Sequence, residues 1–138
     1  MSPPRPATSS SRPRGGLERG SASVELVILL PALFAILFLG VQSALYYHAR
    51  AVAIAAAQTG AHAAAAENGH TSDGTRAADE FITQAGGNNV LPNAAETSTR
   101  SPVVATVTVT GTSLSVIPGW TPHITQTARV PVERITAP

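Results

Sequence analysis

The carboxylate of Glu25 stands at the start of a long apolar segment, where a charge is costly. From Leu26 to Ala49, 24 residues follow without a formal charge. On insertion scales, a carboxylate a turn into a bilayer-spanning helix costs about 3 kcal/mol unless it is paired or reaches the interface. Glu25 either lies at the headgroup level, neutralised by Arg19 or lipid, or awaits a positive partner from another chain or a newly exposed N-terminus.

The remaining polar side chains do not form the patterns of an active site. None of the histidines has the spacing to nearby acidic residues that is typical of a metal site. The histidines are His48, His62, His70 and His123. Without cysteine, the chain has no thiolate nucleophile, thiolate metal site or disulfide. No Gly-x-Ser-x-Gly motif surrounds a serine, and neither Gly15-Gly16 nor Gly86-Gly87 forms a phosphate loop. We expect a protein that is not an enzyme, with no cofactor, no metal and no small-molecule substrate.

The charge balance also argues against nucleic acid as a partner. The formal net charge is +1, and all nine basic residues are arginine. Once the N-terminal arginines are set aside, no basic field of the size that attracts nucleic acid remains.

Trp120 lies in a Pro-Gly loop, and its position is consistent with two hypotheses. Its ring either forms an exposed binding tip or folds back over a small core, as large amphipathic rings often do.

The apolar segment exceeds the roughly 20 residues that a helix needs to cross a bilayer. Before it stand Arg5, Arg12, Arg14 and Arg19, opposed only by Glu18. Basic flanks tend to stay cytoplasmic, so we expect a single-pass cell-membrane protein with its N-terminus inside and its C-terminus outside. The residues expected at the two interfaces are Arg19, Tyr46, Tyr47 and Arg50. A cleaved secretory signal is the competing reading, with Ala55-Ala56-Ala57 as the cleavage site and a soluble product starting near Gln58.

The first element expected is a very long helix. Ser21 or Ser23 can cap its start, and Pro31 is expected to bend it within the apolar segment. The alanine-rich run 51–66 should continue the helix to about Glu67, giving a length of about 70 Å. Because alanine buries little area, its natural use is close contact with another helix or a sheet.

The C-terminal part is expected to form a short helix and a small antiparallel sheet. His70 to Gly74 is interpreted as a turn, and the second helix as Thr75 to Ala85. Alternation predicts strands over 103–110 and 124–135, with Leu114 to Ile117 as a short edge piece. The fold class is therefore α+β: a long N-terminal transmembrane helix continuing into an alanine-rich stalk, then a short helix and the sheet.

The sequence resembles the TadE-like pseudopilins of tight-adherence (Flp-type) pilus systems. Features that carry the resemblance are Arg19-Gly20-Ser21-Ala22-Ser23-Val24-Glu25, the apolar segment with Pro31, the Tyr46-Tyr47-His48-Ala49-Arg50 end, the alanine-rich extension and a threonine-valine hairpin. The resemblance spans about Arg19 to Arg134. Leu26 stands where these pseudopilins usually have an aromatic residue.

The resemblance implies a processing site and a role in assembly. In type IV pilin-like proteins, a prepilin peptidase cuts after a glycine and leaves glutamate as the fifth mature residue. Here the cut would separate Gly20 from Ser21, and Glu25 would pair with the new ammonium of a neighbouring subunit. The implied function is a minor pilin or pseudopilin whose partners are the membrane, other pilin subunits, pilus assembly proteins and a prepilin peptidase.

Three regions are expected: a disordered basic cytoplasmic leader at 1–20, the transmembrane and stalk helix at 21–68, and a small extracytoplasmic α+β region at 69–138. The alternative function is an uncleaved, single-pass cell-surface binding module that uses the Trp120 loop.

Overall fold

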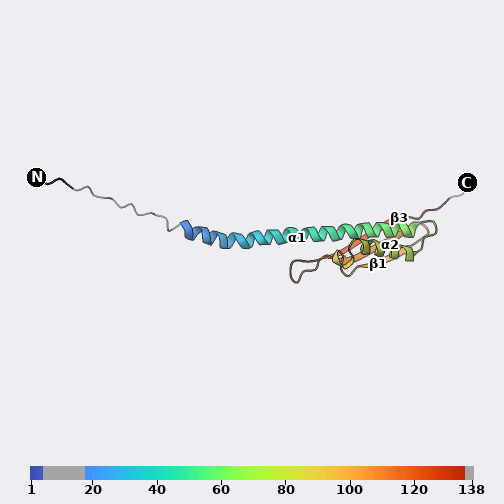
Figure 1. Ribbon diagram of the computed structural model, residues 1–138. Helices are drawn as coiled ribbons and strands as arrows, with labels where there is room; N and C mark the ends of the chain where they lie inside the picture. The colour runs from blue at the N-terminus through green and yellow to red at the C-terminus, as the bar shows by residue number, and fades with distance from the viewer. Residues whose placement is uncertain (5–17, 136–138) are drawn as a thin grey trace. The chain divides into compact units, whose positions relative to one another are not determined.

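The computed structural model describes residues 1–4 and 18–135 (Figure 1). Its elements are the helices α1 (Glu18–Ala65) and α2 (Thr71–Gln84), the 3-10 turn η1 (Gly87–Asn89), and the strands β1 (Ala95–Arg100), β2 (Val104–Thr112) and β3 (His123–Pro131). This order of elements confirms the expected α+β class. The chain forms two compact units, Met1–Ile36 and Leu37–Pro138, which are described separately below as the N-terminal and C-terminal units. Most of the predicted leader lies outside the described residues.

In the N-terminal unit, α1 carries the first part of the apolar segment, up to Ile36, and continues through Pro31. Its large apolar side chains are exposed, including Leu26, Val27, Ile28 and Ile36. Among the described residues, one helix is long and apolar enough to cross a membrane, as judged from its length and composition. The helix begins at Glu18, a few residues before the predicted start at Ser21 or Ser23.

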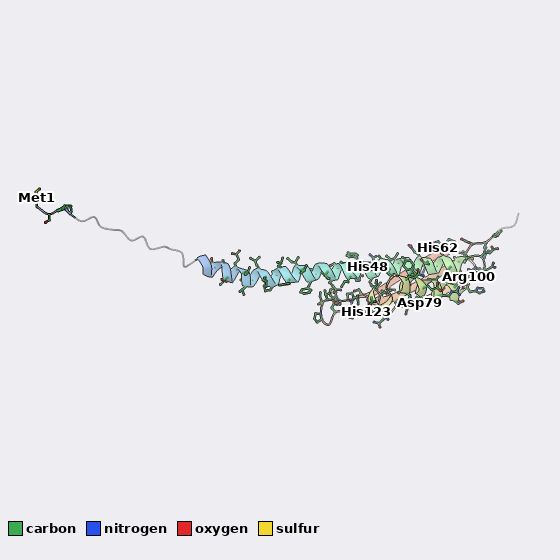
Figure 2. The ribbon with its side chains drawn as sticks, viewed as in Figure 1. Met1, His48, His62, Asp79, Arg100 and His123 are labelled. Carbon is green, nitrogen blue, oxygen red and sulfur yellow. The ribbon has the colours of Figure 1, made fainter. Side chains whose placement is uncertain are left out.

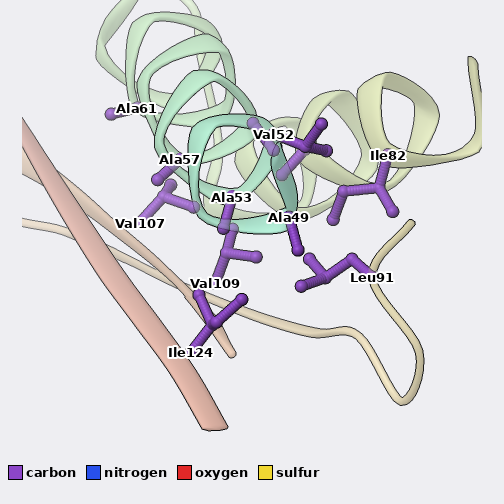
Figure 3. Packing of buried hydrophobic residues seen from close by; sticks show 12 residues of the cluster. Ala49, Val52, Ala53, Ala57, Ala61, Ile82, Leu91, Val107, Val109 and Ile124 are labelled. Atoms are coloured by element: carbon purple, nitrogen blue, oxygen red, sulfur yellow. The ribbon is translucent and has the colours of Figure 1, made fainter. Parts of the chain in front are cut away.

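The C-terminal half of α1 forms the core of the C-terminal unit together with the sheet (Figure 3). Its buried alanines, fully or almost fully inaccessible, are Ala49, Ala53, Ala56, Ala57, Ala61, Ala64 and Ala65. They face larger side chains, among them Val107, Val109 and Ile124. A methyl side chain lets the helix backbone approach the sheet closely while valine and isoleucine fill the remaining space. The expected use of the alanine-rich run as a close packing surface is confirmed.

The sheet is antiparallel, with β2 between β1 and β3. In the middle of the register, Thr97 pairs with Thr108, which in turn pairs with Thr127. Along β2, every second side chain is buried, as the alternation predicted. Pro131 ends the edge strand β3, where its missing N–H does not interrupt the sheet.

Four details of the predicted sheet were wrong. Strand β3 ends at Pro131, four residues before the predicted end at 135. Val103 precedes β2 and is 71% exposed, because the chain turns through Ser101 before the strand begins. Residues 114–117 form no strand, since their polar groups bind α1 and one another instead. Strand β1 was not predicted, because its sequence Ala-Glu-Thr-Ser-Thr-Arg has no large apolar residue.

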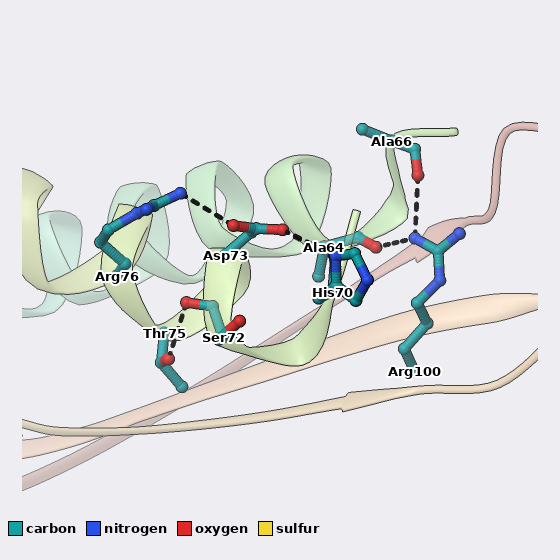
Figure 4. A network of polar contacts seen from close by, with 8 residues as sticks. All are labelled: Ala64, Ala66, His70, Ser72, Asp73, Thr75, Arg76 and Arg100. Carbon is teal, nitrogen blue, oxygen red and sulfur yellow. Dashed lines mark hydrogen bonds and ion pairs between the residues drawn. The ribbon is translucent and has the colours of Figure 1, made fainter. Parts of the chain in front are cut away.

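Helix α2 begins at Thr71, so the predicted turn from His70 to Gly74 is wrong. The Asp73 carboxylate accepts a hydrogen bond of 2.8 Å from the backbone N–H of His70 and pairs with Arg76 at 2.8 Å (Figure 4). These contacts satisfy a free amide at the helix start and place a negative charge at its positive end. They favour a helix over residues His70 to Gly74, which were predicted to form a turn.

The C-terminal end of α1 is closed by a side chain from the sheet. Arg100 of β1 donates hydrogen bonds to the carbonyl oxygens of Ala64 and Ala66 (Figure 4). A guanidinium at this end satisfies carbonyls that lack helical partners and complements the negative end of the helix dipole. The contact also ties the end of α1 to the sheet.

Candidate functional site

The residues expected to be processed lie in the first turns of α1. Gly20 and Ser21 are both helical, and a Cβ added at Gly20 would meet no atom within 4 Å. The Glu25 side chain is exposed, one turn further along. Arg19 also lies in this part of the helix. The backbone here is therefore open on the side of Gly20, and the roles given to these residues stay predictions.

The residues expected at the outer interface lie on two sides of α1. Tyr46 is partly buried and packs against the core, whereas Tyr47 is 65% exposed. The two rings meet edge to face, with 5.9 Å between their centroids. Arg50 is exposed one turn beyond Tyr46. The Tyr46 ring thus packs in the fold, whereas the Tyr47 ring is exposed on the surface of α1.

Gln42 was not predicted from the sequence to have a role in this region. It lies one turn before Tyr46, at the end of the large apolar run, and it is only 2% exposed. Its amide nitrogen donates to the carbonyl oxygen of Leu114 at 3.2 Å. Its amide oxygen accepts from the N–H of Val116 at 2.9 Å and from the hydroxyl of Ser115 at 3.0 Å. One side chain therefore binds three consecutive residues of the segment between β2 and β3.

This contact fixes the connecting segment 113–122, here called the β2–β3 loop, against α1. The Ser115 hydroxyl also lies 2.9 Å from the carbonyl oxygen of Ile117, so its single hydrogen is shared between that oxygen and the Gln42 amide oxygen. Its oxygen accepts a hydrogen bond from the Ile117 N–H at 3.1 Å, and Pro118-Gly119 forms the expected turn. The positive φ of 77° at Gly119 is the conformation that glycine adopts without strain. The loop is thus held by α1 on one side and by a tight turn on the other.

Beside this contact lies an apolar groove of about 410 Å³ within the C-terminal unit. Its lining comes from α1, the loop and the start of β3, and comprises Leu39, Gln42, Ser43, Tyr46, Tyr47, Trp120, Pro122 and His123. Trp120 is 49% exposed. Its ring is therefore neither buried in the core nor fully free, and it forms part of a groove wall together with Tyr47.

The histidines of the C-terminal unit are spread over different elements. His48 and His62 lie on α1, whereas His123 starts β3 (Figure 2). Within residues 1–4 and 18–135, no group of three potential metal-ligating side chains comes together.

Two carboxyl groups in this unit have shifted pKa values. The hydrogen bond from the His70 backbone lowers the pKa of Asp73 below its usual 3.8, and Arg76 acts in the same direction. Burial raises the pKa of Glu96 above its usual 4.5, and the charge of Asp79 adds to that shift. The Oε1 atom of Glu96 is buried and has no hydrogen-bond partner among the described residues. Both shifts have structural causes, and neither carboxyl lines the groove.

A family model described as TadE-like protein matches residues 20–62. The match confirms the resemblance inferred from the sequence over these residues, which belong to α1 and include Glu25 and Gln42. No curated protein and no solved structure matches the chain.

Proposed function

We propose that this chain, whose residues 20–62 match the TadE-like family, is a membrane-anchored minor pilin or pseudopilin. It takes part in assembling a tight-adherence pilus or a related secretion filament, with its N-terminus cytoplasmic and its sheet outside. The regions of the chain are then a leader at 1–20, a transmembrane and stalk helix at 21–68, and an outer region at 69–138. Its partners are the membrane, other pilin subunits and pilus assembly proteins, and its function is association with them.

The observation that carries this proposal is the family match to a helix with an exposed apolar surface. A soluble helix of this composition would bury its leucines and isoleucines, whereas those in the N-terminal unit are exposed. Before assembly, lipid can cover this apolar surface. After assembly, the helices of neighbouring subunits can cover it. Within it, Glu25 supplies a charge that a partner can neutralise.

Replacing Glu25 tests the pairing step directly. Glu25→Ala and Glu25→Gln should leave membrane insertion intact and abolish or strongly reduce filament assembly. Loss of one partner from a buried ion pair costs about 3–5 kcal/mol, which weakens association more than about a hundredfold. The measurement is the yield of assembled filament beside the amount of protein in the membrane. Glu67→Gln removes an exposed carboxylate at the other end of the helical region and should assemble normally. Normal piliation with Glu25→Ala would contradict the pairing role.

The mature N-terminus tests the processing step. Intact mass and terminal sequencing of the protein from its native membrane should show a chain that begins at Ser21. A Gly20→Leu variant should keep the leader, because the peptidase cuts after a glycine in the proteins that this chain resembles. A chain that retains Met1 or Ser2 in the presence of an active peptidase would leave an uncleaved membrane-anchored protein.

The partial exposure of Trp120 favours a second candidate, an uncleaved cell-surface binding module. In that case the groove beside Trp120 holds part of a polymer or a partner protein. This candidate predicts that the protein is spread over the cell envelope with Met1 retained, independently of any filament component.

A further inference from the structure

The groove beside Trp120 is lined in part by apolar residues of α1 that belong to the C-terminal unit. Leu39 lines the groove and also belongs to the exposed apolar run of the helix. On the loop side, Leu114 and Val116 expose apolar side chains as well. We propose that the β2–β3 loop is a membrane-contact site that lies in the outer headgroup region, with lipid filling the groove between Trp120 and Tyr47. This inference rests on the membrane-spanning part of the proposed function and is independent of any filament.

The position of Gln42 along α1 places the loop at the right depth. The run Val24–Val41 has no polar side chain except that of Glu25 near its start. These 18 residues make about 27 Å of helix at 1.5 Å per residue, close to the roughly 30 Å of a hydrocarbon core. With the Glu25 end at the cytoplasmic interface, Gln42 falls at the outer one. The loop that Gln42 binds must then lie at the same level.

The hydrogen bonding of the two polar side chains of α1 that follow the apolar run, Gln42 and Ser43, suits a site with little water. An unpaired amide or hydroxyl in an apolar medium is costly, so polar groups at this depth need partners in the protein. The Gln42 amide has its partners in Leu114, Ser115 and Val116. The next residue, Ser43, donates its hydroxyl to the carbonyl oxygen of Leu39 at 2.8 Å, within the same helix. The first polar side chains beyond the apolar run are therefore satisfied without solvent.

The composition of the loop favours lipid over a charged partner. Residues 113–122 carry no formal charge and include Leu114, Val116, Ile117 and Trp120. Tryptophan and tyrosine are enriched at membrane interfaces, where the ring contacts acyl chains and the polar atom remains hydrated. The exposed rings of Trp120 and Tyr47 are both amphipathic in this way. Contact through α1 and through the loop would fix the height of the sheet above the bilayer and restrict its rotation about the helix.

Trp120 makes the test direct because it is the only tryptophan in the chain. The full-length protein is placed in phosphatidylcholine nanodiscs, and its fluorescence is quenched either by lipids brominated high on the acyl chain or by acrylamide in the water. Two reference proteins carry Trp120→Phe with a new tryptophan elsewhere. Ile36→Trp reports the apolar part of α1, and Thr99→Trp reports the exposed face of β1 at the opposite end of the sheet from the loop.

Brominated lipid should quench Trp120 several-fold more than it quenches the Thr99→Trp reference, and acrylamide should quench it several-fold less. Quenching equal to that of the Thr99→Trp reference would overturn the inference and favour a free binding tip. Shielding from both quenchers would also overturn it, because protein would then cover the ring. If lipid quenches the Ile36→Trp reference but not Trp120, only this inference fails. If lipid fails to quench the Ile36→Trp reference, the membrane-spanning part of the proposed function fails with it.

Discussion

At the residue scale, Gln42 holds the β2–β3 loop against α1 through hydrogen bonds to Leu114, Ser115 and Val116. Replacing it with leucine removes the partner of the Val116 N–H and the Leu114 carbonyl while preserving most of the volume. A buried donor left without a partner costs about 1–3 kcal/mol. We expect Gln42→Leu to lower the free energy of unfolding by about that amount and to speed amide exchange at Val116. Denaturant unfolding in micelles and hydrogen exchange measure the two effects.

Ser43→Ala is the matched control for this substitution. It removes a neighbouring hydrogen bond that stays within α1, because the Ser43 hydroxyl binds only the local carbonyl of Leu39 among the described contacts. Amide exchange in the loop should stay unchanged in this variant. Equal exchange rates at Val116 in Gln42→Leu and the unaltered protein would show that other contacts hold the loop.

The sequence contained a signal for Gln42, although its partners could not be derived. Gln42 is the first polar side chain after Glu25, and a lone amide near the end of an apolar helix calls for a partner. That partner lies more than 70 residues away, in a loop without regular structure. Hydrophobic periodicity and helix or strand propensity describe residues that are close along the chain, so they cannot predict a contact between residues this far apart. Glu25, by contrast, could be singled out because its position alone makes it unusual.

At the scale of elements, the approach of α1 to α2 depends on two glycines. A Cβ at Gly60 would lie 2.5 Å from the Gly74 carbonyl oxygen and 3.1 Å from Val107. The nearest atom belongs to the backbone, so relief requires the helices to move apart. Overpacking of this kind costs about 1–3 kcal/mol, which exceeds the gain of about 1 kcal/mol from placing alanine in a helix. Gly60→Ala should therefore lower the unfolding midpoint.

Gly40→Ala provides the comparison in the same helix, since its Cβ would meet no atom within 4 Å. This variant should match or slightly exceed the stability of the unaltered protein. Similar unfolding midpoints for Gly40→Ala and Gly60→Ala would contradict a tight crossing of α1 and α2.

The same crossing explains an error in the prediction of α2. Gly74 suggested a turn because glycine is common where the chain reverses. In the structure it is a buried helical residue, and a Cβ there would lie 2.6 Å from the Ser98 hydroxyl and 2.9 Å from the Ala64 Cβ. Its small size is needed for packing, which local sequence does not reveal. Strand β2 was predictable because its apolar side chains alternate and face the core, and β3 because buried Ile124 and half-buried Ala128 and Val130 share one face. The side chains of β1 are small or polar, so they do not form such a pattern.

At the scale of the whole molecule, Asp73 and Glu96 give the stability of the C-terminal unit opposite dependences on pH. The pKa of Asp73 is lowered in the folded chain, so its contribution is present above its unfolded pKa and is lost as pH falls through the folded value. The pKa of Glu96 is raised by burial and by Asp79. Folding then favours its protonated form, and its ionisation destabilises the fold as pH rises through the interval above 4.5.

Substitution separates the two contributions. At about pH 7, which is above the usual pKa of both carboxyls, Glu96→Gln should raise the free energy of unfolding and Asp73→Asn should lower it. Asp79→Asn should reproduce part of the gain of Glu96→Gln, because it removes the neighbouring charge and leaves the buried oxygen in place. Urea titrations at several pH values measure all three, and the advantage of Glu96→Gln should shrink as the solution is acidified towards pH 4.5. A pH-independent advantage would mean that the substitution improves packing, with no part played by the charge of Glu96.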